Sequence, residues 1–221
     1  MDIQNHHIVK SYDAELQRLM SEIADMGDVA LTQVEHSLLA LEGRDATLAR
    51  QVIDGDDAID TREREVSHEV LRLLALRQPS ARDLREVMAA LRIASDIERI
   101  ADHAVGVARL SLAMPAGEGG FPENLHALGL LTCDIVHEVL RAWRATDAAL
   151  AHAVWQRDDD LDRTHAVLFH DLLARMRQTP DDAAWCTHLM FVAKNLERIG
   201  DHATNIAENV WFVVEGESGL S

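Results

Sequence analysis

Apolar residues recur every three or four positions along most of the chain, which is the spacing that places them on one face of an α-helix. Gly and Pro, the residues that most often end helices, interrupt this periodicity at only a few points. Together, the pattern and its breaks predict six long helices. Their expected ranges are about 8–41, 46–77, 81–112, 123–145, 148–178 and 181–214.

The densest run of Gly and Pro in the chain extends from Met114 to Pro122. A run of this composition is typical of a connector between structural units rather than of a helix. We therefore expect a first three-helix unit over residues 1–114, a linker over residues 115–120 and a second three-helix unit over residues 121–221.

The second half of the chain repeats the first. The segment Glu98-Arg99-Ile100-Ala101-Asp102-His103-Ala104 returns 99 positions later as Glu197-Arg198-Ile199-Gly200-Asp201-His202-Ala203. Upstream of it, acidic and apolar positions between residues 45 and 60 return 102 positions later. A repeat of long helices joined by short turns predicts two tandem three-helix bundles with nearly antiparallel helices. The expected fold class is therefore all-α.

Composition agrees with this class, because Ala, Leu, Arg and Glu are abundant and aromatic and β-branched residues are few. A chain of 221 residues is long enough for a well-buried core in one or two domains. Its 38 acidic and 21 basic residues give a formal net charge of −17. Such a charge repels nucleic acid and anionic membranes, and it suits multivalent cations or a basic patch on another protein.

The cellular location can also be predicted from the sequence. Cys133 and Cys186 are too few and too far apart for a disulfide framework or a thiolate metal site, so we expect two reduced core thiols. The first residues lack the basic and apolar regions of a signal peptide. No uninterrupted apolar run is long enough to span a bilayer. These features predict a soluble cytoplasmic protein.

Each copy of the repeated segment places two carboxylates four residues apart, Glu98 with Asp102 and Glu197 with Asp201. Residues at this spacing share a helix face, where like charges destabilise the helix by about 0.2–0.5 kcal/mol. No basic residue lies on the row between them, so we expect a compensating partner. The candidates are a metal cation, basic groups of another protein, or water together with the neighbouring arginines.

Helical-wheel positions place these acids in line with apolar residues rather than on the solvated face. Glu98 and Asp102 align with Leu84, Leu91 and Val105, and the acids of the preceding helix also interrupt an apolar row. Partly buried carboxylates are costly unless they are protonated or bound to a cation, and oxygen ligands suit hard metal ions. The predicted metal ligands are Asp56, Asp60, Glu63, Glu98 and Asp102 in the first unit and Asp158, Asp162, His165, Glu197, Asp201 and Glu208 in the second.

The two predicted metal sites differ in their ligands. His165 in the second unit extends the choice of metal to iron, manganese or zinc. Asn205 and Glu208 continue the acidic row of the last helix, where the first unit has Gly106 and Arg109. We therefore expect the second site to bind metal more tightly.

Other polar residues carry weaker predictions. His103 and His202 lie about 100° around the helix from the neighbouring aspartates. We therefore expect them to lie at the surface or to contact the residues that bind the metal, rather than to bind the metal themselves. Glu65 and His68 have the E-x-x-H spacing of di-iron bundles, but on the opposite side of the helix from Asp56, so a surface position is expected. No P-loop, glycine-rich nucleotide motif, nucleophile elbow or H-E-x-x-H motif occurs, which argues against an enzyme.

Several motifs, in order along nearly the whole chain, resemble the PhoU family of phosphate-transport accessory regulators. Both E-R-I-x-D segments are part of this resemblance. In the first unit, Val105-Gly106-Val107-Ala108-Arg109 replaces the N-I-A-E sequence usual in the family. The other matching segments are His7 to Leu16, Met26-Gly27, Asp56 to Asp60, Pro79 to Arg85 and Thr204 to Glu208.

The resemblance implies two three-helix bundles related by pseudo-two-fold symmetry, and frequent homodimers. It also implies iron or zinc at the E/D-x-x-x-D motifs of at least some members, with manganese or magnesium as alternatives that the ligand chemistry allows. In function, it implies a negative regulator of the phosphate-starvation response that has no catalytic activity. Such a protein is an adaptor between the phosphate ABC transporter, with its ATPase, and a membrane sensor histidine kinase, and it curbs phosphate uptake.

Two other functions remain open at this point. One is a metal-free helical interaction module, whose acidic rows dock basic segments of the transporter or kinase. The other is a di-metal carboxylate enzyme. That enzyme would need E-x-x-H pairs on the acidic rows, and the sequence lacks them.

Overall fold

The computed structural model describes residues 3–77, 81–115 and 121–216, and over these ranges the ordered elements are helices, with no β-strand. This confirms the all-α class. The helices are α1 (Ile3–Gly43), α2 (Ala46–Asp54), α3 (Asp56–Arg77), α4 (Ala81–Leu112), α5 (Glu123–Ala145), α6 (Ala148–Gln156), α7 (Asp158–Gln178) and α8 (Ala183–Glu215), with a short 3₁₀ helix at Pro180–Asp182 before α8.

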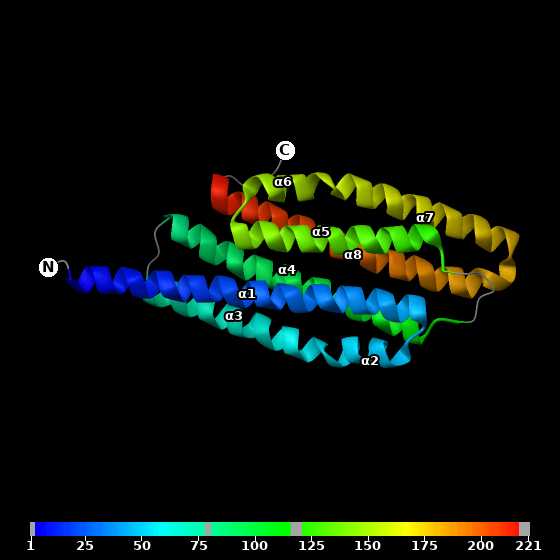
Figure 1. Cartoon of the computed structure of the whole chain (residues 1–221), viewed down its shortest axis with the longest axis horizontal. Coiled ribbons are helices and arrows are strands. Elements are labelled where there is room, and N and C mark those ends of the chain that lie inside the picture. The colour runs from blue at the N-terminus through cyan, green and yellow to red at the C-terminus, as the bar shows by residue number, and fades with distance from the viewer. Residues whose placement is uncertain (1–2, 78–80, 116–120, 217–221) are drawn as a thin grey trace.

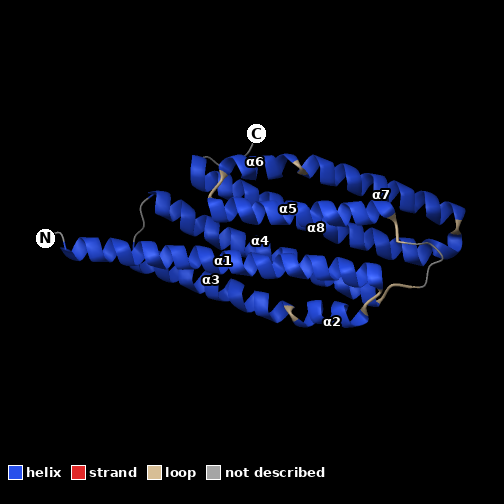
Figure 2. Cartoon of the chain, in the orientation of Figure 1, coloured by secondary structure: helices blue, strands red, loops and turns tan. Residues whose placement is uncertain are grey.

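The six predicted helices are present, but two of them are interrupted (Figure 2). The expected helix 46–77 is broken at Gly55 into α2 and α3, and the expected helix 148–178 is broken at Arg157 into α6 and α7. At each break a run of aspartates follows and forms the first turn of the new helix, where the helix dipole favours negative charge. Apolar periodicity continues through both breaks, so it could not reveal them.

Most of the predicted linker, residues 116–120, lies outside the described residues. The division of the chain into two units at this point therefore stays a prediction. The helices before and after it are grouped in the way the repeat suggests. In Figure 1, α1 to α4 lie together on one side and α5 to α8 on the other.

Four long helices form the middle of the molecule. α4 and α8 run beside each other, α1 packs on α4, α5 packs on α8, and α1 also contacts α5 (Figure 1). The broken pair α2 and α3 covers α4 on one side, and α6 and α7 cover α8 on the other. Apolar residues from both halves form one large buried core, and a smaller cluster packs α2 against α1 and α4. α4 and α8, which carry the repeated acidic segments, are therefore neighbours.

The turns that precede α2 and α6 are equivalent in the repeat. Each contains a residue in the left-handed conformation, Arg44 with φ of 51° and Thr146 with φ of 49°. An aspartate follows in each turn and caps the next helix: the side chain of Asp45 accepts hydrogen bonds from two backbone N–H groups, and that of Asp147 accepts one from Leu150. These caps fix the direction in which α2 and α6 leave the turns.

The structure shows whether several other residues lie in the core or at the surface. Trp143 and Trp185 are buried. Of the two cysteines predicted to be core thiols, Cys186 is fully buried, whereas Cys133 is only partly buried. Glu65 and His68 are exposed on α3, which confirms the surface position predicted for them. In the described ranges, no helix combines the length and apolar content needed to cross a bilayer.

Candidate functional site

The structure brings five of the predicted acidic residues together in what we call the first acidic cluster: Asp56, Asp60 and Glu63 on α3 with Glu98 and Asp102 on α4. The kink at Gly55 starts α3 beside the middle of α4, and this places the two acidic rows opposite each other. All five side chains are partly buried. Carboxylates from two helices therefore share one half-buried region at the edge of the core.

Electrostatics in the first acidic cluster favour the protonated forms. Burial raises the pKa of Asp56, and the charges of Asp102 and Asp60 raise it further. Burial also raises the pKa of Glu98, again with a contribution from Asp102. Arg109 partly offsets the effect on Asp56. A bound cation would relieve the same repulsion that raises these pKa values.

The second acidic cluster consists of Asp158 and Asp162 on α7 with Glu197 and Asp201 on α8. Burial raises the pKa of Asp158. The Thr204 hydroxyl donates a hydrogen bond of 3.2 Å to Asp158 Oδ1, and this bond lowers the pKa and so offsets part of the increase. Burial and repulsion from Glu197 raise the pKa of Asp201. In both halves, therefore, the first aspartate of the covering helix and one acid of the repeated segment have raised pKa values, at Asp56 and Glu98 in the first half and at Asp158 and Asp201 in the second.

A basic residue of α4 contacts the acidic row, as in one of the three alternatives considered from the sequence. Arg99 lies between Glu98 and Asp102 in sequence, and its side chain bends to reach both, with nitrogen–oxygen distances of 3.3 Å to Glu98 and 2.9 Å to Asp102. Although Arg99 lies on a different row of the helix, its side chain is long enough to reach the acids of the neighbouring row. Arg99 itself is exposed, so these ion pairs contribute little stability.

The second copy repeats these ion pairs on α8. Arg198 lies 3.1 Å from Asp201 and 3.9 Å from Glu197. Lys194, which has no basic counterpart in α4, also pairs with Glu197. Of the three partners considered for the acids, the neighbouring basic side chains are therefore present in both clusters.

The two remaining predicted ligands of the second site are His165 and Glu208. His165 is partly buried on α7, where its ring centroid lies 6.5 Å from that of Phe169 with the ring planes tilted by 43°. Glu208 is exposed two turns beyond Asp201 on α8. Asn205, expected to extend the acidic row, instead donates a hydrogen bond to Asp96 on α4.

Among the described residues, no three His, Cys, Asp or Glu side chains converge closely enough, in the conformations they adopt in this structure, to hold a metal ion. The donors themselves are the oxygen ligands that hard cations prefer. For a metal to bind, Asp102 and Asp201 would have to leave their arginine partners and turn toward the opposite helix. The assignment of metal ligands therefore stays a prediction.

The two histidines of the repeated segments join α4 to α8. The Nδ1–H of His103 donates to the amide oxygen of Asn195 over 3.0 Å, and that of His202 donates to Asp96 over 2.9 Å. The two imidazole rings stack with centroids 5.7 Å apart. Burial lowers the pKa of His103, and the neighbouring His202 lowers it further. Sequence reasoning missed these bonds, although Asp96 and Asn195 are equivalent residues of the repeat.

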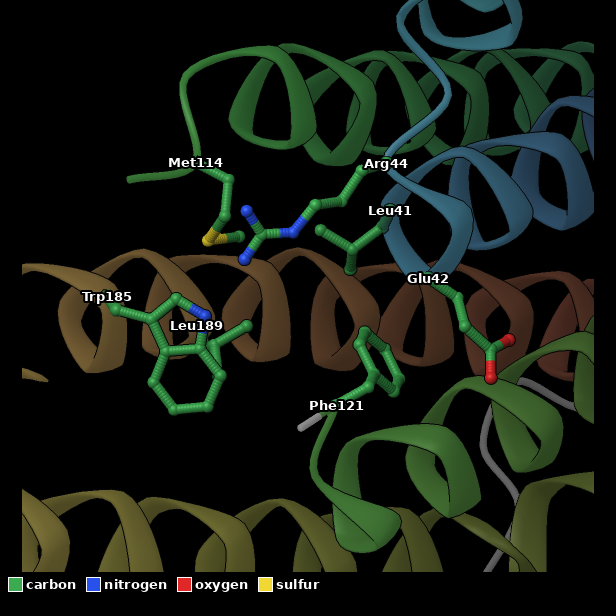
Figure 3. Close-up of a pocket in the computed structure, with 7 residues that line it drawn as sticks. All are labelled: Leu41, Glu42, Arg44, Met114, Phe121, Trp185 and Leu189. Atoms are coloured by element: carbon green, nitrogen blue, oxygen red, sulfur yellow. The ribbon is translucent and has the colours of Figure 1, made fainter. Parts of the chain in front are cut away.

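A separate pocket of about 180 Å³ lies where the C-terminal ends of α1 and α4 meet the N-terminal ends of α5 and α8 (Figure 3). Its lining is mostly apolar, and Figure 3 shows the side chain of Arg44 extending across it toward Met114, above Trp185. No residue of either acidic cluster lines it. The pocket therefore does not belong to the acidic sites.

Comparison with known proteins identifies both halves of the repeat. The sequence profile of the PhoU domain matches residues 23–111 and again residues 125–210. The chain is 49% identical over 218 residues to a protein of Xylella fastidiosa strain Temecula1 named "phosphate-specific transport system accessory protein PhoU homolog", and the match covers 98% of this chain and 90% of that protein. A Caulobacter vibrioides protein of the same name is 41% identical, with 96% of this chain and 93% of that protein covered.

Solved structures show the same fold. The crystal structure of the phosphate transport system regulatory protein PhoU from Streptococcus pneumoniae superposes with a TM-score of 0.89 at 28% identity, covering 95% of this chain and 100% of that chain. The crystal structure of PhoU from Pseudomonas aeruginosa gives a TM-score of 0.88 at 35% identity, with 93% and 100% covered.

Proposed function

The chain belongs to the PhoU family of phosphate-transport accessory and regulatory proteins, and on this premise we propose that it is a negative regulator of the phosphate-starvation response. In this role it is a cytoplasmic adaptor, without catalytic activity, between the phosphate ABC transporter ATPase and a sensor histidine kinase, and it limits phosphate uptake. The observation that carries the proposal is similarity over 98% of the chain to a phosphate-specific transport system accessory protein.

The physical character of the surface supports an adaptor. The net charge of −17 and the two acidic clusters favour partners that present basic groups. Each cluster includes acids of one central helix, α4 or α8, so a partner bound at either cluster would contact a helix that joins the two halves. We also expect a homodimer, whose mass light scattering would measure.

We further propose that the two acidic clusters bind metal ions, iron or zinc in the first place, with manganese or magnesium as alternatives. The support is the donor set itself: oxygen atoms from two helices, partly buried, with raised pKa values at Asp56, Glu98, Asp158 and Asp201. A cation would replace the protons that these groups otherwise favour. The residues proposed to hold it are Asp56, Asp60, Glu63, Glu98 and Asp102 in the first unit and Asp158, Asp162, His165, Glu197, Asp201 and Glu208 in the second.

The regulatory role is tested by deleting the gene. The expected result is that phosphate-scavenging genes are derepressed in high phosphate, and that a plasmid copy of the wild-type chain restores repression. Unchanged repression in the deletion strain would contradict the proposal. Transcript measurements in high and low phosphate make this comparison, with the low-phosphate culture as the fully derepressed reference.

One alternative has structural support. A metal-free module, whose acidic rows dock basic segments of partners, agrees with the arginine and lysine pairs that already neutralise the acids. Elemental analysis of protein purified without chelator separates the two. Stoichiometric metal supports the metal-binding proposal, and metal that stays far below one ion per cluster supports the module.

A further inference from the structure

An apolar groove, which we call the α1–α5 groove, runs between the C-terminal part of α1 and the N-terminal part of α5, with a volume of about 280 Å³. Leu38 and Leu125 form part of its floor, and Leu39 and Leu130 stand on its two walls. Gly129 allows this arrangement, because a Cβ atom there would lie 3.0 Å from Leu38 Cδ2. The close approach of the helices leaves the two wall leucines pointing outward.

The walls of the groove are exposed to an unusual degree for large apolar side chains. Leu39 is 57% exposed and Leu130 is 59% exposed, and they belong to different helices that border the same groove. Scattered exposed leucines need no explanation, but apolar side chains gathered around a concave site indicate a binding surface. Phe121 lines both this groove and the pocket of Figure 3, so the apolar lining continues around the end of the bundle.

The charged residues that line the groove are mainly acidic. Glu35 and Glu42 line it from α1, and their spacing of seven residues puts them on one edge about 10 Å apart. The only basic group among the lining residues is His126, whose Nδ1 lies 3.7 Å from Glu42 Oε2. One edge of the groove therefore carries two negative charges that are two turns of α1 apart.

We propose that the α1–α5 groove binds a basic amphipathic helix of a partner protein. Leucine-like side chains of that helix insert between Leu39 and Leu130, and two Lys or Arg residues seven positions apart pair with Glu35 and Glu42. This is the helix-in-groove mode of recognition, in which apolar anchors give affinity and charges give orientation. The inference rests on the proposed function only in assuming that the adaptor has a protein partner.

Other occupants fit the groove less well. Its volume of about 280 Å³ lies at the small end of the range typical of small-molecule sites, and few polar groups converge in it to orient such a ligand. A second copy of this chain, related by a two-fold axis through the groove, would bring the glutamates of both copies together. Charge complementarity therefore favours a basic partner over self-association.

The binding test uses a synthetic helical peptide with leucines on one face and lysines beside that face at seven-residue spacing. Fluorescence anisotropy with the full chain should show binding that weakens as salt is added. Leu39→Ser and Leu130→Ser should each weaken it at least ten-fold, whereas Leu71→Ser, equally exposed at 62% but on α3, should not change it. Equal effects of all three substitutions would overturn the proposal.

Three further comparisons test the role of charge and the location of the peptide. Glu35→Gln/Glu42→Gln should reduce the salt dependence, and Glu65→Gln/Glu215→Gln, the same charge change elsewhere, should not. A peptide with glutamates in place of the lysines should bind at least ten-fold more weakly. Cys133 lines the groove, so bound peptide should slow its reaction with a maleimide, measured by mass spectrometry. Equal binding of both peptides, or no protection of Cys133, would count against the groove.

Light scattering and a reporter strain complete the test. A dimer that dissociates with Leu130→Ser would show that a second copy covers the groove, which overturns the proposal. In cells, the Leu130→Ser allele should derepress phosphate-scavenging genes in high phosphate as the gene deletion does. If the deletion derepresses and a normally folded Leu130→Ser protein still represses, the groove inference fails while the proposed function stands. If the deletion itself has no effect, the proposed function fails.

Discussion

The Nδ1 atom of His202 on α8 lies 2.9 Å from the Oδ1 atom of Asp96 on α4. The equivalent pair of the other half, His103 with Asn195, has an amide where the first has a carboxylate. The two halves of the repeat are thus joined by two equivalent hydrogen bonds, one to a charged acceptor (Asp96) and one to a neutral acceptor (Asn195). This difference makes the interface between α4 and α8 sensitive to which residue occupies positions 96 and 195.

Asn195→Asp should raise the pKa of His103 by about 1, because a carboxylate stabilises the imidazolium form. The pKa of His103 is lowered from 6.5 in the folded protein, so its stabilising contribution is present above pH 6.5 and lost as the pH falls through the folded-state value. The variant should therefore lose less stability below pH 6.5. NMR titration of His103 and thermal unfolding between pH 5 and 8 measure both effects.

The reverse substitution provides the control. Asp96→Asn keeps the acceptor for His202 and Asn205 but removes the charge, so it should destabilise the protein by about 1 kcal/mol. A pKa of His103 that does not move in Asn195→Asp would show that burial alone sets it.

Gly200→Ala should destabilise the protein, because a Cβ atom there would lie 2.0 Å from Leu161 Cδ2. Leu161 is fully buried and has little room to move. Overpacking costs about 1–3 kcal/mol, and the better helix propensity of Ala returns up to about 1 kcal/mol. We expect the melting temperature to fall by about 2–4 °C, measured by calorimetry.

The other half of the repeat suggests the rescue. Ile59 and Ala101 occupy the positions equivalent to Leu161 and Gly200. Leu161→Ile added to Gly200→Ala should therefore recover most of the lost stability. If the double variant is less stable than either single variant, the two positions do not pack against each other in the way described.

Asp158→Asn should stabilise the chelator-treated protein at neutral pH. The pKa of Asp158 is raised from 3.8 by burial and by neighbouring acids, so the folded state holds its proton more tightly than the unfolded state does. Its contribution to stability is therefore complete below pH 3.8 and lost as the pH rises through the folded-state pKa. At pH 7 the amide should raise the melting temperature by about 1–2 °C, and near pH 4 it should not.

Glu65→Gln controls for the change in net charge in that experiment, since Glu65 is exposed on α3. It should leave the melting temperature unchanged at both pH values. A gain from Asp158→Asn that is as large at pH 4 as at pH 7 would mean that repulsion between the carboxylates is not its cause.

Glu197→Ala/Asp201→Ala should remove more bound metal than Glu98→Ala/Asp102→Ala. The charge of Arg109 acts on Asp56 of the first acidic cluster, whereas the second unit has Glu208 at the position equivalent to Arg109. A basic side chain near the first cluster lowers its need for a metal ion. Elemental analysis of the two variants, with Glu65→Ala/His68→Ala as the control, gives the ranking, and a larger loss from the first pair would reverse it.

The clusters of acids were predictable from the sequence because helical periodicity is local. The four-residue spacing of Glu98 and Asp102 fixes a common face whatever the rest of the chain does. The repeat then indicated that Glu197 and Asp201 lie in the same way. Neither observation could show that Arg99 reaches across to both acids, because the path of a long side chain depends on the space around it.

Local sequence thus determined the helical class, the breaks between most helices and the duplicated acidic rows, since each depends on residues close together in the chain. Tertiary structure alone decided which helices of the two halves touch. It paired His103 with Asn195 and His202 with Asp96, and it left Leu39 and Leu130 exposed on either side of one groove. The residues in each of these pairs are about 90 or more positions apart in the chain. The apolar periodicity of a helix depends on residues a few positions apart, so it cannot predict which distant residues lie together.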